Sequence, residues 1–323
     1  MTTHRRALLL LLPAALLAPA LLPGAGCRSA GELTVAGARP EGCADCHQEV
    51  TAEWRSSAHA SAWTALDGAA QADPACQGCH APGSVLPGGA APAARDVARE
   101  AGVDCQACHL AADGVLTGPL RTDDQRLLEA HPTRRDYFTY KASDLCGSCH
   151  RTTFGQWQAA AHTGVRPTCQ ECHMPSVTRA RIQGGVAGAL EPLARQRRHA
   201  FGVELAPGVN GEALEATLEA AREGEAVLAR ASLTSHILHR LPSSEPGPVP
   251  AEWRLTLVAR RGDGAEAGRV EEVLGGGPQG ALLPGVVRAL QGRFPAETLR
   301  LELELRRERP RPRVVLRREL TVR

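Results

Sequence analysis

The sequence predicts a chain of two unlike parts: a first part of short helices and long irregular loops, and a C-terminal part built from β-strands. Three observations predict this division. The pattern Cys-x-x-Cys-His occurs five times within residues 43–173 and not beyond them. Stretches rich in Gly, Pro and Ala lie between the copies, which favours loops. Beyond residue 250, apolar residues alternate with polar ones, which is the period of a half-buried strand.

Each Cys-x-x-Cys-His copy has the spacing that attaches a c-type haem. Two thiols three residues apart on a tight turn can form thioethers with the two vinyl groups of one porphyrin, and the next imidazole then reaches the iron as proximal ligand. We therefore predict five haem c groups. The attachment residues are Cys43, Cys46, Cys76, Cys79, Cys105, Cys108, Cys146, Cys149, Cys169 and Cys172. The proximal ligands are His47, His80, His109, His150 and His173.

Two other uses of paired cysteines explain the pattern less well. Zinc sites combine two Cys-x-x-Cys pairs, or one pair with a spaced pair of histidines, and do not require His in the next position. A disulfide framework suits an exported chain, but it gives no reason for the histidine. Ten of the 11 cysteines lie in the repeated pattern, which favours haem attachment.

The N-terminus predicts export. A short positive region at residues 4–6 precedes a Leu/Ala run at residues 7–22 that two prolines interrupt. This run is typical of a signal peptide and is too short and too proline-broken for a membrane span. We predict a signal peptide at 1–26 and, as in a bacterial lipobox, lipidation of Cys27, with ordinary cleavage nearby as the alternative. A linker at 27–42 would follow. The protein is then periplasmic or outer-membrane-associated, tethered by a lipid anchor without crossing the membrane.

Composition narrows the choice of cofactor ligands and partners. The net charge of +2 gives no indication of a nucleic-acid partner. Aromatic residues make up only 3% of the chain, so porphyrins would supply much of the flat apolar bulk of a core. Met1 leaves with the signal peptide, and Met174 directly follows a proximal histidine. His/Met ligation, which raises the reduction potential, is therefore excluded, and His/His ligation at low potential is expected.

The first part contains an internal repeat. After the first and the fourth Cys-x-x-Cys-His, a Trp follows at the same distance, and then a His. Each copy continues into a similar second motif, so duplication of a two-haem unit, with the third haem inserted between copies, is the simplest explanation. We expect helices within 49–64, 121–130 and 154–162, and a loop at 82–94.

Six histidines outside the motifs are candidates for the second, distal iron ligand. They are His59, His131, His162, His199, His236 and His239. Five are needed for full bis-histidine ligation. His59 and His162 occupy equivalent places in the repeat, which favours both of them as distal ligands. His131 is a further candidate, the alternative being an exposed loop histidine. His236 and His239 are three residues apart, so we expect only one of them to ligate.

Several of these segments resemble the multihaem cytochromes c of the cytochrome c-554-like superfamily, over roughly residues 40–260. The segments are 43–59, 102–109, 131–136 and 169–175. The resemblance implies that His199, in a His-x-Phe element, and His239, in an element similar to Gly-His-x-x-Pro with Leu238 replacing Gly, are distal ligands. It also implies a haem-dense, mostly α/irregular multihaem cytochrome domain at 43–205, followed by a sandwich-like all-β domain at 206–323 that carries His239.

The C-terminal part has three clear strand patterns, at 253–259, 299–305 and 314–322. The segment 214–234 is ambiguous from its residues: its Ala and Glu content favours a helix, whereas 222–225 could be the turn of a hairpin. The resemblance favours strands. We expect a short helix at 286–291. Nothing in this part indicates catalysis, and a structural or docking role is expected.

Electron transfer is the function that these features predict, between a membrane or periplasmic donor and a terminal acceptor. The partners would be redox proteins, the membrane through the anchor and, in a haem-stacked oligomer, further copies of the chain.

The alternative is a multihaem reductase of a small nitrogen or sulfur oxyanion, which needs one iron with an open distal position. Pentahaem nitrite reductases carry a Cys-x-x-Cys-Lys site, and the sole lysine, Lys141, lies outside any Cys pair. No residue is assigned a catalytic role. A haem-based sensor would also need an output module, which the sequence does not reveal.

Overall fold

The computed structural model describes residues 40–120, 131–162, 164–202, 213–243, 252–275, 280–309 and 312–323. The predicted signal peptide, Cys27 and most of the linker lie outside these residues. So do the helix expected at 121–130 and the domain boundary expected between 205 and 206. Within the described residues, no helix combines the length and the apolar character that crossing a membrane requires.

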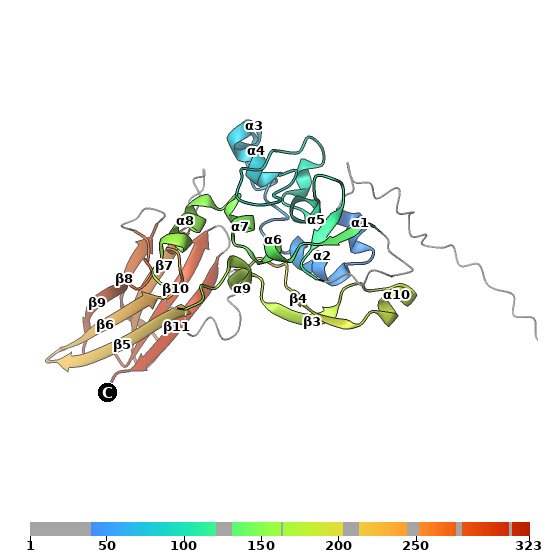
Figure 1. Cartoon of the computed structure of the whole chain (residues 1–323). Coiled ribbons are helices and arrows are strands. Elements are labelled where there is room, and N and C mark those ends of the chain that lie inside the picture. Colours follow the sequence, from blue (N-terminus) through green and yellow to red (C-terminus); the bar gives the residue numbers. More distant parts are fainter. Residues whose placement is uncertain are drawn as a thin grey trace, which may run out of the picture.

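Short helices and two small sheets make up the first part (Figure 1). The helices are α1 (Pro40–Ala44), α2 (Gln48–Arg55), α3 (Gly68–Ala72), α4 (Pro74–His80), a 3₁₀ turn (Arg99–Ala101), α5 (Cys105–His109), α6 (Tyr137–Lys141), α7 (Asp144–Gly147), α8 (Arg151–Ala159), α9 (Cys169–His173) and α10 (Gly185–Leu190). The parallel strands β1 (Leu116–Gly118) and β2 (Thr133–Arg135) form one sheet, and the antiparallel strands β3 (Ser176–Ala180) and β4 (Leu193–Arg197) form the other.

The Cys-x-x-Cys-His copies fold into two kinds of helical turn. In the second, third and fifth copies one short helix, α4, α5 or α9, contains both cysteines and the histidine. Side chains of Asp73, Asp104 and Thr168 cap these helices by accepting backbone N–H bonds. In the first and fourth copies the histidine instead stands at the N-cap of the next helix, α2 or α8. The sequence repeat is thus also a structural repeat.

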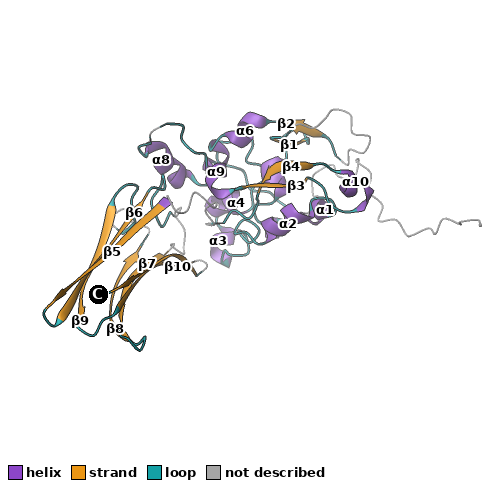
Figure 2. Ribbon diagram, turned by 90° about the horizontal axis from the view of Figure 1, so that it is seen from below, coloured by secondary structure: helices purple, strands orange, loops and turns teal. Residues whose placement is uncertain are grey.

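In the C-terminal part, the described residues form seven strands in two antiparallel sheets (Figure 2). The three-stranded sheet has the order β5 (Leu214–Glu223), β6 (Ala226–Ser235) and β9 (Val287–Pro295). The four-stranded sheet has the order β11 (Arg313–Thr321), β10 (Arg300–Arg309), β7 (Glu252–Arg260) and β8 (Glu266–Leu274). One apolar core draws side chains from both sheets, including the fully buried Leu233, Leu257 and Leu303, so the sheets form a sandwich.

The ambiguous segment at 214–234 is a hairpin, as the resemblance implied. β5 and β6 pair along their whole length, with Glu223 opposite Ala226. Gly224, with φ of +60°, makes the tight turn between them. The three strands expected further along the chain are β7, β10 and β11.

The helix expected at 286–291 is wrong, because this segment lies in strand β9 and pairs with β6. Its burial has period two, with Leu290 and Phe294 inward and their neighbours outward. Pairing with a central strand and burial of these side chains outweigh the weak helical propensity of a short segment.

Leu303, which has no exposed surface, tests the importance of the sandwich core. We expect Leu303→Ala to lower the free energy of unfolding of the sandwich by about 2–5 kcal/mol, because it removes buried methyl groups and leaves a cavity. Val287→Ala, at a side chain that is 56% exposed, should cost less than about 1 kcal/mol. Guanidinium unfolding of the haem-loaded chain, followed by β-sheet circular dichroism, measures both. Equal losses would contradict the assigned core.

The sandwich contacts the first part through the loop that follows β6. The backbone N–H of Arg240 donates to the side-chain oxygen of Gln156 on α8, at 3.2 Å, and the hydroxyls of Thr153 and Ser243 form a further hydrogen bond. This loop contains His239, so the contact brings a histidine of the C-terminal part to the helical part.

Candidate functional site

Four of the five motif histidines face a second histidine from a distant part of the sequence. The pairs are His47 with His131, His150 with His59, His109 with His199, and His173 with His239. Their ring centroids are 6.3, 6.1, 6.2 and 6.2 Å apart, respectively. The agreement of four separations to within 0.2 Å indicates one common function.

These separations fit a metal ion held between two imidazoles. A metal–imidazole bond is about 2.0 Å long and a ring nitrogen lies about 1.1 Å from the ring centroid, so two rings that ligate one ion from opposite sides have centroids roughly 6.2 Å apart. Aromatic rings in direct contact have centroids anywhere from about 4.5 to 7 Å apart, so the agreement of the four separations, and not any single value, supports a shared ion. Each pair also stands beside two cysteines on one helical turn. The residues present therefore fit a covalently attached haem, with its iron between the two rings.

Hydrogen bonds at the other ring nitrogen orient most of these histidines. The Nδ1 atoms of His47, His109 and His199 lie 2.8, 2.7 and 2.9 Å from the backbone carbonyls of Arg181, Thr117 and Arg197, respectively. His80 and His239 make the same kind of contact, with Ala62 and Arg240. A neutral imidazole that donates from Nδ1 keeps its lone pair on Nε2, which is the form that ligates a metal ion.

Burial keeps three of the paired rings, those of His59, His173 and His199, in this neutral form. Removal from water, aided by repulsion from the facing ring of His150, lowers the pKa of His59 to about 3. The same causes lower the pKa of His173 and His199 to about 4, the facing rings being His239 and His109. These three rings are therefore uncharged at neutral pH and available as ligands.

His80, the fifth motif histidine, faces no other imidazole among the described residues. Its Nδ1 lies 2.7 Å from the carbonyl oxygen of Ala62, so its Nε2 is oriented as in the four pairs. The helix α4 presents Cys76 and Cys79 on the same turn. This motif thus has every part of a haem site except a second histidine.

The two remaining candidate ligands, His162 and His236, lie on the surface. His162 is exposed, and its Nε2 lies 3.1 Å from the carbonyl oxygen of Val165. His236 is half exposed and faces the carboxylate of Glu215. The repeat predicted equivalent roles for His59 and His162, but the structure brings only His59 to a motif histidine. Of His236 and His239, which are three residues apart, only His239 faces a motif histidine, His173.

Contacts between cysteines of different motifs join the five sites into two groups, the first with the third motif and the second with the fourth and fifth. Side chains of Cys43 and Cys105 are within hydrogen-bonding distance, which joins the first motif to the third. The pair Cys79 and Cys149 joins the second motif to the fourth, and Cys146 with Cys169 joins the fourth to the fifth. Porphyrins attached at these cysteines would lie close to one another.

Three neighbours of the ligands were not identified from the sequence. The Tyr140 ring stacks on His109, with centroids 5.1 Å apart, and its hydroxyl donates to the carbonyl of Cys108. Glu53 accepts a hydrogen bond from the backbone of His199. A Cβ on Gly102 would lie only 2.4 Å from the carbonyl oxygen of His59, so glycine is required there. Gly102 and Glu53 lie within segments that carry the resemblance, 102–109 and 43–59, whereas Tyr140 lies outside all of them.

Comparison with known protein families gives two matches in the first part. Residues 42–110 match the family of cytochrome c554 and c-prime. Residues 134–196 match the N-terminal region of the NapC/NirT cytochrome c family. Together the two matches include the segments of all five motifs. No curated protein sequence matches the chain.

Comparison with solved structures extends the likeness to the C-terminal part. The chain is similar to a penta-heme cytochrome c552 from Thermochromatium tepidum, with a TM-score of 0.63 and 17% sequence identity over 89% of this chain and 99% of that one. At this identity the likeness establishes the fold. A weaker likeness, to β-glucosidase 3B from Thermotoga neapolitana, has a TM-score of 0.19 and 11% identity over 33% of this chain and 15% of that one. It carries no argument about function.

Proposed function

Because this chain is a multihaem c-type cytochrome, we propose that it is an exported electron carrier with five haem c groups. The observation that supports this best is the set of four histidine pairs with nearly equal ring separations. The penta-heme neighbour and the five Cys-x-x-Cys-His copies support the number of haems. The predicted signal peptide supports export.

In this proposal the cysteines and the histidine of each motif have different roles. The two cysteines fix the porphyrin edge, and the motif histidine holds the iron from one side. The distal ligands are His131 for the first motif, His199 for the third, His59 for the fourth and His239 for the fifth. When bound, haem iron supplies one-electron exchange between its ferric and ferrous states. Imidazoles on both sides of the iron change little between the two states, which suits transfer of electrons without bond making.

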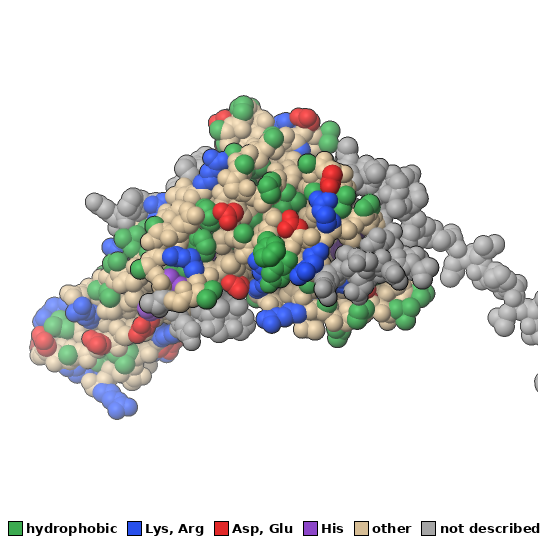
Figure 3. Space-filling view, viewed as in Figure 1, with side chains coloured by type: hydrophobic (Ala, Val, Ile, Leu, Met, Phe, Trp, Pro, Cys, Tyr) green, Lys and Arg blue, Asp and Glu red, His purple; other side chains and the backbone are tan. Residues whose placement is uncertain are grey.

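The cysteine contacts support passage of electrons within the molecule. The contact of Cys43 with Cys105, and the separate contacts from Cys79 through the fourth motif to Cys169, support close packing of the porphyrins that these cysteines would hold. We propose redox proteins as donor and acceptor, and attachment to a membrane through Cys27. Basic and acidic side chains are interspersed on the face that Figure 3 shows, in keeping with the net charge of +2 and without indication of a nucleic-acid partner.

A second candidate function rests on His80. The described residues offer its iron no second histidine, so a small molecule could bind there. The lack of a second histidine at His80 favours an alternative function, the reduction of a small nitrogen or sulfur oxyanion at the second motif. The other four sites would then deliver electrons to it. His80 would hold the iron, and its bond to the carbonyl of Ala62 would increase the basicity of the ligand.

Low-temperature EPR of the oxidised protein, with spin counted per haem, tests the ligand assignment. We expect four low-spin haems, from the four histidine pairs, and one high-spin haem at His80. Addition of cyanide should convert the high-spin signal alone. Five low-spin haems would contradict an open site at His80, and fewer than four would contradict the assigned pairs.

Activity assays separate the two candidate functions. If the protein is a carrier, reduced protein should pass electrons to an oxidised redox protein and show no turnover of nitrite, hydroxylamine or sulfite above that of His80→Ala. Turnover that is lost in His80→Ala, with the other haems retained, would instead identify a reductase.

A further inference from the structure

A buried ion pair lies beside one of the proposed distal ligands. Two guanidinium nitrogens of Arg179, on β3, donate to the two carboxylate oxygens of Glu53, on α2, at 2.8 and 3.1 Å. The Arg179 side chain is 4% exposed and that of Glu53 is 16% exposed. The paired geometry and the burial set this pair apart from the many exposed Arg–Glu pairs of the sandwich.

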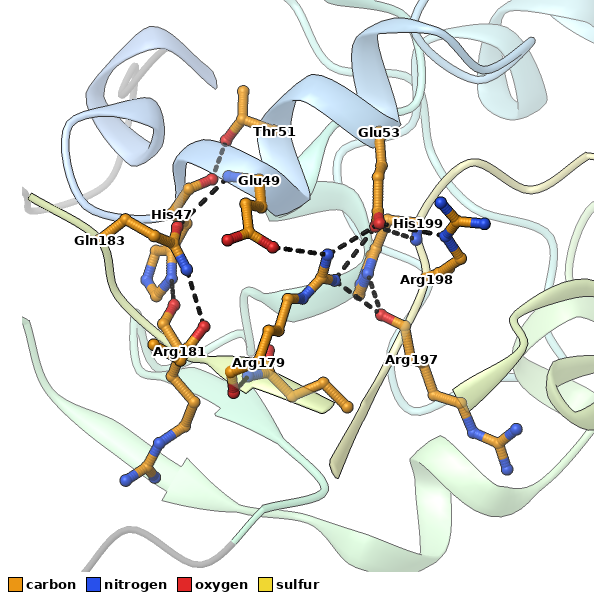
Figure 4. Close-up of polar contacts among 12 residues, drawn as sticks. His47, Glu49, Thr51, Glu53, Arg179, Arg181, Gln183, Arg197, Arg198 and His199 are labelled. Carbon is orange, nitrogen blue, oxygen red and sulfur yellow. Dashed lines mark hydrogen bonds and ion pairs between the residues drawn. The ribbon is translucent and has the colours of Figure 1, made fainter. Parts of the chain in front are cut away.

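Each partner of the pair also holds the backbone that carries His199 (Figure 4). The backbone N–H of His199 donates to Glu53 at 2.9 Å. Arg179 donates to the carbonyl of Arg197 at 3.1 Å. That same carbonyl lies 2.9 Å from Nδ1 of His199 and so sets the direction of its ring. The ion pair thus fixes both the main chain of the ligand and the acceptor that orients its imidazole.

The same two elements hold the proximal ligand of the first motif. Helix α2 begins at His47, and Arg181, just beyond β3, offers its carbonyl to Nδ1 of His47 at 2.8 Å. Figure 4 shows the two histidines on either side of the Glu53–Arg179 pair. The contact of Cys43 with Cys105 brings the first and third motifs together at this place. The pair therefore links two neighbouring haem sites.

Stability alone is a weak reason for such a pair. Desolvation of two buried charges offsets much of their attraction, and apolar side chains of similar volume often stabilise a fold as well. Glu53 nevertheless stays ionised. Its two oxygens accept hydrogen bonds from two guanidinium nitrogens of Arg179 and from the backbone of His199, and all these contacts favour the carboxylate. Two fixed charges of opposite sign therefore stand next to the ligand.

We propose that Glu53 and Arg179 are positioning residues for His199, and that their balanced charges set the reduction potential of the iron between His109 and His199. This proposal rests on the proposed function, because it takes His199 to be an iron ligand. A buried charge acts strongly through a medium of low dielectric constant. A positive charge favours the ferrous state and a negative charge favours the ferric state.

The sign of the potential shift distinguishes this role from a merely structural one. E53Q removes the close partner of Arg179 and leaves it only the carboxylate of Glu49, at 3.9 Å, so the potential of one haem should rise. R179Q leaves Glu53 only the half-exposed Arg198, at 3.4 Å, so the potential of the same haem should fall. The double variant E53Q/R179Q removes both charges and should lie close to the original potential. Loosening of the fold would give no such reversal of sign.

The experiment is a redox titration of the full-length, haem-loaded protein, followed by the low-temperature EPR signal of each low-spin haem. The matched control is D113N. Asp113 pairs with Arg134 close to the third motif, but both side chains are about half exposed, so solvent and salt screen the lost charge. We expect a shift in one low-spin haem for E53Q and for R179Q, and none for D113N. If one of the two single variants gives too little haem-loaded protein, the direction of the potential shift in the other variant is enough to test the proposal.

Shifts of the same sign in E53Q and R179Q, or shifts no larger than that of D113N, would overturn the proposal. H199A separates this failure from failure of the proposed ligation. If H199A converts one low-spin haem to high-spin while the charge variants shift nothing, His199 is a ligand and the ion pair does not tune it. If H199A leaves every low-spin haem intact, the ligation itself is wrong and the proposal fails with it.

Discussion

Protein produced without haem attachment is expected to fold only in its C-terminal part. The apolar core of the described residues draws every member from 214–322. In the first part, by contrast, the buried apolar side chains of the described residues are few and scattered: Trp54, Ala81, Pro82, Val85 and Ala107. So small a buried apolar surface cannot offset the conformational entropy of ordering this many residues.

Limited proteolysis and circular dichroism of cytoplasmically produced protein without its signal peptide test this expectation. The protected fragment should begin near residue 213 and retain the β-sheet spectrum, whereas the haem-loaded protein should also resist cleavage in the first part. The free energy of unfolding of the β-sheets should be the same in haem-loaded and haem-free protein to within about 1 kcal/mol, since the only proposed haem ligand of the C-terminal part is His239, in a loop outside the core. A haem-free first part that resisted proteolysis as well as the loaded one would refute the argument.

Replacement of His59 by alanine should convert one low-spin haem to high-spin without loss of covalent haem. The two thioethers and His150 remain, so the porphyrin stays attached, but the iron loses one of its two imidazoles. The EPR spin count should fall from four low-spin haems to three, with a matching gain of high-spin signal. Mass spectrometry should show an unchanged number of haems.

His162→Ala is the matched control, because His162 occupies the same place in the sequence repeat. Its ring is exposed and contacts the carbonyl of Val165, so we expect no change in the spin state of any haem. Conversion of a haem in His162→Ala, and not in His59→Ala, would reverse the assignment of the two repeat copies.

Much of the architecture could be predicted from local patterns. The alternation of Leu301, Leu303 and Leu305 with charged residues predicted strand β10, because side chains of a strand point to opposite faces in turn. The segment at 286–291 was mispredicted, because its burial depends on pairing with β6 and not on its own residues. The hairpin at 214–235 could be identified only through the resemblance, because its Ala and Glu residues suit a helix equally well.

The sequence repeat was a reliable guide to the backbone and a poor guide to ligands. Trp54 and Trp157 donate from equivalent positions to backbone carbonyls, of Val103 and Pro167. The histidines five residues later nevertheless differ. The carbonyl of His59 accepts from the N–H of Val103, beside Gly102, and its ring faces His150. His162 has no equivalent neighbour among the described residues.

By itself, the sequence predicted the covalent chemistry: five haem attachment sites, their proximal histidines, and the exclusion of methionine as a ligand. These follow from residues adjacent in the chain, because a thioether pair and its histidine fit on one helical turn. Only the tertiary structure decided which distal histidine faces which motif. His131, His59, His199 and His239 each meet a partner far along the chain. Such pairings depend on the packing of the whole fold, and no local spacing encodes them.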